Sequence, residues 1–384
     1  DMILGAIKEH EEFNPQDFNS LWHDSPREQQ CQLEKAIFSL LEDWAFNPQF
    51  KIEEHRCYLK KFIFSLNMFD RSENFNRMRN IAKSKMDDIR QDMYRIRDSM
   101  AETSEGGKKV IDRNEVPSIA SDGPQIRIKV KDEFLELGRQ SEDMKKHVDE
   151  EVLVPLIMGV ASEVLNDFKE QLGKALSGDC GDNAVCVDDK ENVQTVLKEH
   201  QNWQRWFTVA KVKDATRMKA KTKEYAEEKS WPGSEYLGDC LRAMVVCRGG
   251  KESGDTIYQT WLQLEKAFGI KKDNGRLKNN FATAGVLKGE KHQKPPDMLM
   301  NITLNVEGCM PMPAEIQVHH EVILELKESK DYLLYEIYRA DSISSLQGSG
   351  QASNNSKIIK KVLEEKDNLL KENAKVMEEN AKVL

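Results

Sequence analysis

The sequence contains no apolar stretch that approaches the length of a membrane-spanning helix. Its first residues, DMILGAIKEHEEF, lack the basic and long apolar segments of a signal peptide. Cysteine is also scarce, at 7 of 384 residues, and the cysteines are irregularly spaced. This usage argues against a disulfide framework and favours a reducing compartment. We therefore expect a cytoplasmic protein without a membrane span.

A basic excess is missing as well. The 57 Lys and Arg residues are outnumbered by 66 Asp and Glu residues, which gives a net charge of −9. Because affinity for nucleic acid depends on a basic footprint, nucleic acid is not an expected partner. The mean hydropathy of −0.66 is low for one compact globule and predicts extended helices. The length allows two or three domains.

The first part of the chain is predicted to be entirely helical. Residues 1–104 show three helical patterns and no strand signal. The longest pattern has the seam of a bundle or coiled coil, which either binds a partner or packs within its own domain. The seam residues are Met86, Ile89, Met93, Ile96 and Met100. The glycines and prolines of residues 105–125 predict a linker between domains.

A second helical block is predicted over residues 126–205, with a short strand as an option at residues 126–130. Cys180 and Cys186 lie among acids, but the register of a calcium loop and the ligands of a zinc site are missing. Residues 177–191 are therefore expected to form an exposed loop. The chain is expected to return to helix over residues 193–207, with Trp203 and Trp206 as core anchors.

Residues 206–340 are the part of the chain with strand patterns. The apolar run Leu241–Cys247 predicts a buried strand and places Asp239 at its entrance. Residues 298–306 and 314–318 alternate between apolar and polar. Since side chains on a strand repeat every second residue, Glu315 and Gln317 share one face. A closing helix that packs on the sheet is predicted from Val322, Ile323, Leu326, Leu333, Leu334 and Ile337.

Two acids on neighbouring strands can hold a divalent cation with positions left open for nucleotide phosphates. A basic run precedes Asp239, where lysines could act as point charges on phosphate, although such runs are more often solvated helix faces. Its members are Lys211, Lys213, Arg217, Lys219, Lys221 and Lys223. His319 and His320 point to opposite faces of a strand and are expected to be structural.

The segments GDCLRAMVV, AEIQVH and LELKESKDYLLYEIYR make residues 206–340 similar to the nucleotidyltransferase domain of the Rel/Spo alarmone synthetases, especially its divergent relatives in eukaryotic microbes. Members of that family use one magnesium ion to move a pyrophosphate group from ATP to the ribose 3'-hydroxyl of a guanine nucleotide. The resemblance implies these roles: metal binding by Asp239 and Glu315, catalysis by Glu315 and Arg242, and nucleotide binding by Lys211, Lys213 and Gln317.

One departure from the family shapes the functional prediction. Where the family carries a tyrosine that stacks on the acceptor base, this chain has Met298, Leu299, Met300 and Asn301. The missing aromatic predicts a degenerate nucleotidyltransferase-like domain, a pseudoenzyme that serves as an interaction or structural protein. The alternative is an active magnesium-dependent nucleotidyltransferase or pyrophosphokinase acting on guanine nucleotides.

The last part of the chain predicts association with another protein. The segment LQGSGQASNNS is typical of a flexible linker, which we place at residues 341–356. In residues 357–384, leucine and valine positions recur every seven residues. This repeat predicts a coiled-coil helix, and because it is short, a protein partner is expected to bind between Lys357 and Leu384. The complete prediction is an α+β protein with a helical N-terminal region, a mixed-sheet domain and a C-terminal coiled-coil helix.

Overall fold

A computed structural model describes residues 15–46, 65–117, 127–177, 184–188, 196–197, 200, 202–270, 275–283, 294–343 and 346. The chain divides into two compact units. The first contains residues 1–92, 288–292 and 325–384, and the second contains residues 93–287 and 293–324. The predicted coiled coil at residues 357–384 lies outside the described residues, as does most of the predicted linker before it. None of the helices in the described part of the chain is both long and apolar enough to cross a membrane.

The first unit is helical in its described part, as the patterns in residues 1–104 predict. Its elements are α2 (Pro15–Asp24), α3 (Arg27–Phe46), η2 (Asn67–Asp70), the residues of α5 (Ser72–Thr103) up to Asp92, and the chain from Glu325 through η6 (Lys327–Asp331) and α15 (Tyr332–Arg339). Phe18, Trp22, Phe38 and Phe69 are buried in its core. Met86, the methionine of the predicted α5 seam that belongs to this unit, is buried, which supports packing within the protein's own fold.

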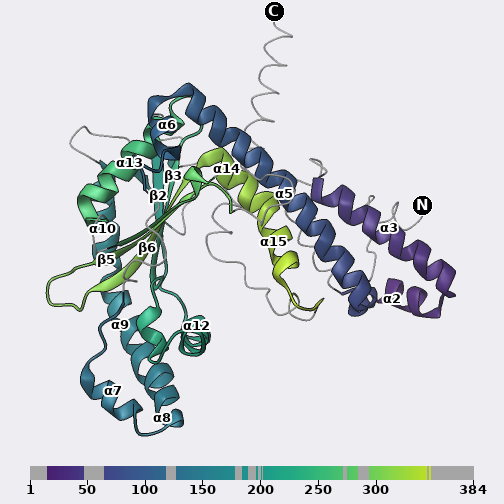
Figure 1. The fold of residues 1–384 in the computed structure, drawn as a ribbon, viewed down its shortest axis with the longest axis horizontal. Helices are drawn as coiled ribbons and strands as arrows, with labels where there is room; N and C mark the ends of the chain where they lie inside the picture. The colour runs from purple at the N-terminus through teal and green to yellow at the C-terminus, as the bar shows by residue number, and fades with distance from the viewer. Residues whose placement is uncertain are drawn as a thin grey trace, which may run out of the picture. The chain divides into compact units, whose positions relative to one another are not determined.

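The second unit is built around a six-stranded mixed sheet (Figure 1) with the order β1-β2-β3-β6-β5-β4. The strands are β1 (Ala184–Cys186), β2 (Arg205–Ala210), β3 (Leu241–Cys247), β4 (Gly275–Asn279), β5 (Met298–Leu304) and β6 (Met312–His320). The pairs β1–β2 and β3–β6 are parallel, and the other neighbours are antiparallel. The predicted α+β class with a mixed sheet is confirmed, and the predicted strand Leu241–Cys247 matches β3.

Helices accompany the sheet in the second unit (Figure 1). They are α6 (Glu105–Ile111), α7 (Asp132–Gly138), α8 (Glu142–His147), the π-helical turn η3 (Val148–Leu153), α9 (Val154–Glu163), α10 (Leu165–Ser177), α12 (Ala215–Glu228), η4 (Gly233–Tyr236), α13 (Ser253–Phe268), η5 (Asn280–Ala282) and α14 (Glu321–Leu326). As its apolar spacing predicts, α13 buries Ile257, Trp261 and Leu264 and packs against β3, β5 and β6. Its last turn ends at Gly269, whose φ of 61° is left-handed.

Several sequence predictions need correction. Trp206 belongs to β2 rather than to a helix, and Ala184–Cys186 forms the edge strand β1 inside the segment expected to be an exposed loop. Short strands of this kind leave little periodic signal because long-range pairing, rather than local pattern, decides them. In the described part of the optional strand at residues 126–130, residues 127–130 are irregular. The closing helix predicted from Val322 to Ile337 is divided between the two units, because the second unit ends at Leu324 and α15 belongs to the first.

The predicted linker at residues 105–125 begins with a helix instead. Ser104 caps α6 by accepting a hydrogen bond from the Gly107 amide. A Cβ atom added at Gly106 would lie 2.5 Å from the Asp255 carboxylate, and one added at Gly254 would lie 2.5 Å from the Cα of Gly107. These glycines therefore allow α6 and α13 to approach closely, a function that composition alone does not distinguish from linker flexibility.

Candidate functional site

A row of polar side chains crosses one face of the central sheet. In the strand register, Arg242 of β3 is paired with Glu315 of β6, Glu315 with Asn301 of β5, and Asn301 with Arg276 of β4. Paired residues on neighbouring strands project from the same face. Two cations therefore flank an acid and an amide on one face of the sheet. Buried polar groups of this kind are costly unless they are paired or hydrogen-bonded.

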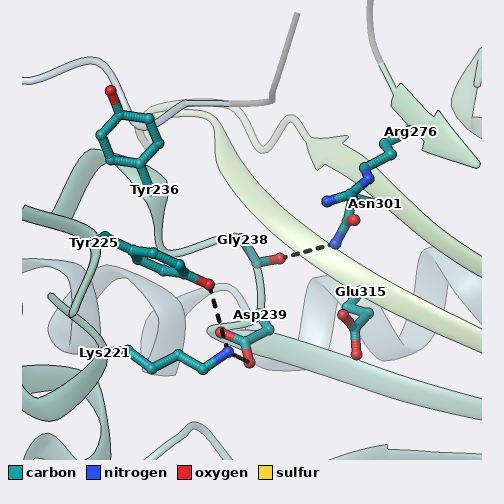
Figure 2. Close-up of a pocket in the computed structure, with 8 residues that line it drawn as sticks. All are labelled: Lys221, Tyr225, Tyr236, Gly238, Asp239, Arg276, Asn301 and Glu315. Atoms are coloured by element: carbon teal, nitrogen blue, oxygen red, sulfur yellow. Dashed lines mark hydrogen bonds and ion pairs between the residues drawn. The ribbon is translucent and has the colours of Figure 1, made fainter. Parts of the chain in front are cut away.

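Asp239 adds a second acid to this row. It lies in the irregular segment just before β3, and its Oδ2 accepts hydrogen bonds from Lys213 Nζ at 2.6 Å and from Lys221 Nζ at 3.4 Å. Lys213 follows β2, and Lys221 belongs to α12. Asn301 Nδ2 donates to the carbonyl of Gly238 at 3.3 Å, which ties this segment to β5 (Figure 2).

The lysines keep Asp239 ionised. Burial raises the pKa of Asp239, but attraction by Lys213 and Lys221 outweighs burial and holds the pKa below its ordinary value. The two lysines respond differently. Burial lowers the pKa of Lys213, which is 7% exposed, and the attraction of Asp239 only partly offsets it. For Lys221, which is 38% exposed, burial acts in the same direction but Asp239 prevails, so its pKa is raised.

The pKa of Glu315 is shifted in the opposite direction from that of Asp239. Burial raises its pKa above the ordinary value, and the hydrogen bond from Gln317 only partly compensates. Gln317 Nε2 donates to Glu315 Oε1 at 2.8 Å, which confirms that the two side chains share one face. On the same face, His319 Nε2 lies 3.3 Å from Gln317 Oε1, and His319 Nδ1 lies 4.0 Å from the Asp297 carboxylate.

Part of this cluster lines a pocket of about 470 Å³, its open mouth included, which is shown in Figure 2. It is lined by Lys221, Tyr225, Tyr236, Gly238, Asp239, Arg276, Asn301 and Glu315. The two tyrosine rings lie 6.2 Å apart, centroid to centroid, at an angle of 55°. Tyr225 comes from α12 and Tyr236 from η4, so the pocket has aromatic groups although β5 supplies none.

The predicted site residues are largely brought together. Asp239 and Glu315 line the same pocket. Arg242 is paired with Glu315 in the polar row, and Lys213 is hydrogen-bonded to Asp239. Gln317 contacts Glu315 but is not among the lining residues. Lys211 is exposed and is not among them either.

Sequence reasoning did not select Lys221, Tyr225, Tyr236, Arg276 or Asn301 as site residues. Two signals were available. Tyr225 follows Lys221 by four residues and so shares its helix face. Tyr236 precedes Asp239 by three residues in the same short segment. The β4 and β5 residues could be recognised only from the strand register, which the sequence does not specify.

The acids also fit a magnesium ion. Mg²⁺ is usually held by one or two carboxylates together with substrate phosphates and water. Asp239 Oδ1 is buried and accepts no hydrogen bond within the described part of the chain, so its lone pairs are available to a cation. Among the described residues no group of three or more His, Cys, Asp or Glu side chains could hold a metal. An ion between Asp239 and Glu315 would therefore need further oxygen ligands from a substrate.

Comparisons with known proteins give a distant likeness. No family model matches this sequence, and no curated protein matches it. Among solved structures, small alarmone synthetase 1 from Bacillus subtilis is 16% identical, with a TM-score of 0.23 over 57% of this chain and 98% of that one. The same enzyme bound to its product pppGpp gives 16% identity and a TM-score of 0.23 over 48% and 90% of the two chains. Bound to AMPCPP, it gives 13% identity and a TM-score of 0.22 over 57% and 98%. At these values, nothing about ligand or activity follows for this chain.

Proposed function

We propose that the second unit binds a nucleoside polyphosphate together with Mg²⁺ in this pocket and transfers a pyrophosphate or nucleotidyl group from it. The observation that carries the proposal is the charge of the site. Lys221 and Arg276 line the pocket together with Asp239 and Glu315. Lys213 is hydrogen-bonded to Asp239 and Arg242 is paired with Glu315, so the four cations in and next to the pocket exceed its two acids by two (4 − 2). Such a surplus around a partly buried pocket suits phosphate groups.

The two acids are suited to different tasks. Asp239, whose pKa is lowered, stays ionised and would hold the metal together with Glu315. Glu315, whose pKa is raised, is the more basic of the two carboxylates and would take the proton of an attacking hydroxyl. When bound, Mg²⁺ would neutralise negative charge on the phosphates. Arg242 and the lysines would stabilise charge that develops there.

The nucleotide base also has a candidate surface. Tyr225 is partly exposed and lines the pocket on the side of α12. Its ring would supply the stacking surface that Met298, Leu299, Met300 and Asn301 cannot provide. Together with the resemblance to the Rel/Spo synthetases, this arrangement supports ATP as donor and a guanine nucleotide as acceptor.

A second candidate function keeps the ligand but not the reaction. The short bond from Lys213 occupies Asp239 Oδ2, and β5 contributes no aromatic side chain to the pocket. Both observations favour a pseudoenzyme that binds nucleotide without turnover. In that case the protein serves as an interaction or structural protein, and the predicted coiled coil at residues 357–384 would bind its partner.

Calorimetric titration with a non-hydrolysable ATP analogue, with and without Mg²⁺, tests binding. Incubation with ATP and GDP or GTP, followed by chromatography, tests transfer. We expect Mg²⁺-dependent binding, and loss of both binding and product in Asp239→Asn. Glu307→Gln, which removes an acid from the exposed β5–β6 turn, is the matched control and should behave as wild type. Binding without product would select the pseudoenzyme, whereas absence of binding would overturn the proposal.

A further inference from the structure

We propose that Asp149, which belongs to the helical block and not to the pocket, is a positioning residue for nucleotide binding. It fixes the segment Ser230–Asp239, here called the pocket loop, which supplies Tyr236, Gly238 and Asp239 to the site. This inference rests on the proposed function, because its consequence is measured on nucleotide affinity. It also assigns a role to residues 127–177, which form part of the helical block predicted over residues 126–205.

Asp149 is a buried acid whose carboxylate accepts three hydrogen bonds from one short segment. The residue is 3% exposed and lies in the π-helical turn η3. Its carboxylate accepts hydrogen bonds from the amide of Gly233 at 3.0 Å, the amide of Ser234 at 3.2 Å and the hydroxyl of Ser234 at 2.6 Å. Ser234 is fully buried. Two backbone donors and one hydroxyl of the pocket loop therefore depend on a single side chain.

Neighbouring contacts hold the same loop at further points. Trp231 Nε1 donates to the carbonyl of Lys145 at 3.0 Å, and the amide of Ile128 donates to the carbonyl of Glu235 at 3.1 Å. Gly233 lies directly on α12, because a Cβ atom there would come within 2.0 Å of the Thr222 carbonyl oxygen. The loop is thus placed between the helical block and the helix that carries Lys221 and Tyr225.

Replacement of the carboxylate should release the loop locally. An Asn side chain offers one acceptor oxygen where the carboxylate of Asp149 offers two. Its NH2 group would face donors of the pocket loop that need an acceptor. Buried N–H groups left without acceptors are costly, so the pocket loop should shift toward water to satisfy them. Ser234 is two residues from Tyr236 and five from Asp239, so a shift there would move the metal-binding acid. A purely structural role would lower stability without changing affinity.

Asp149→Asn and the milder Ser234→Ala, which removes one of the three donors, test this inference in the full chain. Hydrogen exchange measured by mass spectrometry reports on residues 230–240, and calorimetry with a non-hydrolysable ATP analogue and Mg²⁺ reports on affinity. For Asp149→Asn we expect exchange in the loop to accelerate at least about tenfold and affinity to fall about tenfold. Ser234→Ala should show smaller changes of both. Glu150→Gln carries the same charge change on the adjacent residue and should alter neither.

Unchanged exchange in the loop of Asp149→Asn would overturn the inference, and so would faster exchange with unchanged affinity. If Asp149→Asn does not fold, Ser234→Ala decides by the same two measurements. Failure of wild-type protein to bind the nucleotide would overturn the proposed function together with this role in binding. That result is separable from failure of the inference alone, in which wild type binds and the variant binds equally well.

Discussion

The two units each bury an acid against basic side chains, and the two arrangements differ in whether they are complete. In the first unit, Arg90 Nε and Nη2 lie 2.7 and 3.1 Å from the two carboxylate oxygens of Asp331, and the side chains are 5% and 4% exposed. In the second unit, the two acids of the pocket, Asp239 and Glu315, have four cations in or next to the pocket: Lys213, Lys221, Arg242 and Arg276. Within the described residues, Asp239 Oδ1, Arg242 Nε and Arg276 Nε are buried without a hydrogen-bond partner.

The difference indicates what each cluster is for. A bidentate pair with both oxygens bonded has no capacity left for a ligand, and its loss is felt as loss of stability. A cluster with several charged groups and unpartnered atoms beside an open pocket still has atoms that a ligand can contact. The first unit therefore shows a structural ion pair, and the second shows a candidate binding site.

The largest expected effect is a difference in the free energy of unfolding between variants of Asp331 and of Asp239. Asp331→Asn breaks the buried bidentate ion pair with Arg90, so the free energy of unfolding should fall by about 3–5 kcal/mol. Asp239→Asn should cost less than half as much, because Asp239 lies beside an open pocket and one of its two partners, Lys221, is 38% exposed to water. Urea unfolding followed by circular dichroism measures both. Equal costs for the two variants would contradict the distinction.

The sequence predicted only part of the candidate site in the second unit. Leu241–Cys247, residues 298–306 and residues 314–318 were recognised as strands because burial of a sheet face imposes a local pattern of apolar residues. The pairing of Glu315 with Gln317 followed from the same periodicity. Tyr236 and Arg276 were not recognised, because they join the pocket through strand order and loop anchoring between distant parts of the sequence. Asp149 was not recognised for the same reason.

A smaller effect is expected from removing one cation of the pocket. Lys221→Met takes away a positive charge that contacts Asp239 and lines the pocket, so affinity for the Mg²⁺–nucleotide analogue should fall about tenfold, or about 1.4 kcal/mol. Lys223→Met removes the same charge from an exposed position on α12 and should leave affinity within about twofold of wild type. Calorimetry compares the two variants directly. If both weaken binding alike, the effect comes from net charge and not from the pocket.

The smallest effect should appear as a pH dependence in the pocket face of β4. Burial lowers the pKa of Lys278 to about 8, helped by repulsion from Arg276 and Lys294 and opposed by attraction from Glu315 and Asp297. Because this pKa lies below that of an ordinary lysine, Lys278 in the free protein is charged below about pH 8 and neutral above it. A phosphate group nearby favours the charged form, so binding should be coupled to proton uptake and should weaken as pH rises from 7 to 9.

The expected loss of affinity across that range is a few-fold, and at most about tenfold, because one charge at the margin of the pocket is involved. Calorimetry at pH 8 in buffers of different ionisation enthalpy measures the proton uptake, and titrations at pH 7 and 9 measure the affinity. Lys278→Met should bind more weakly at pH 7 and lose most of the dependence on pH. The Arg90–Asp331 pair has no surplus charge, so Asp331→Asn should leave this profile in place. If the affinity of Lys278→Met falls as steeply with pH as that of wild type, another group titrates. The positive charges that act on the ligand would then not extend along β4 as far as Lys278.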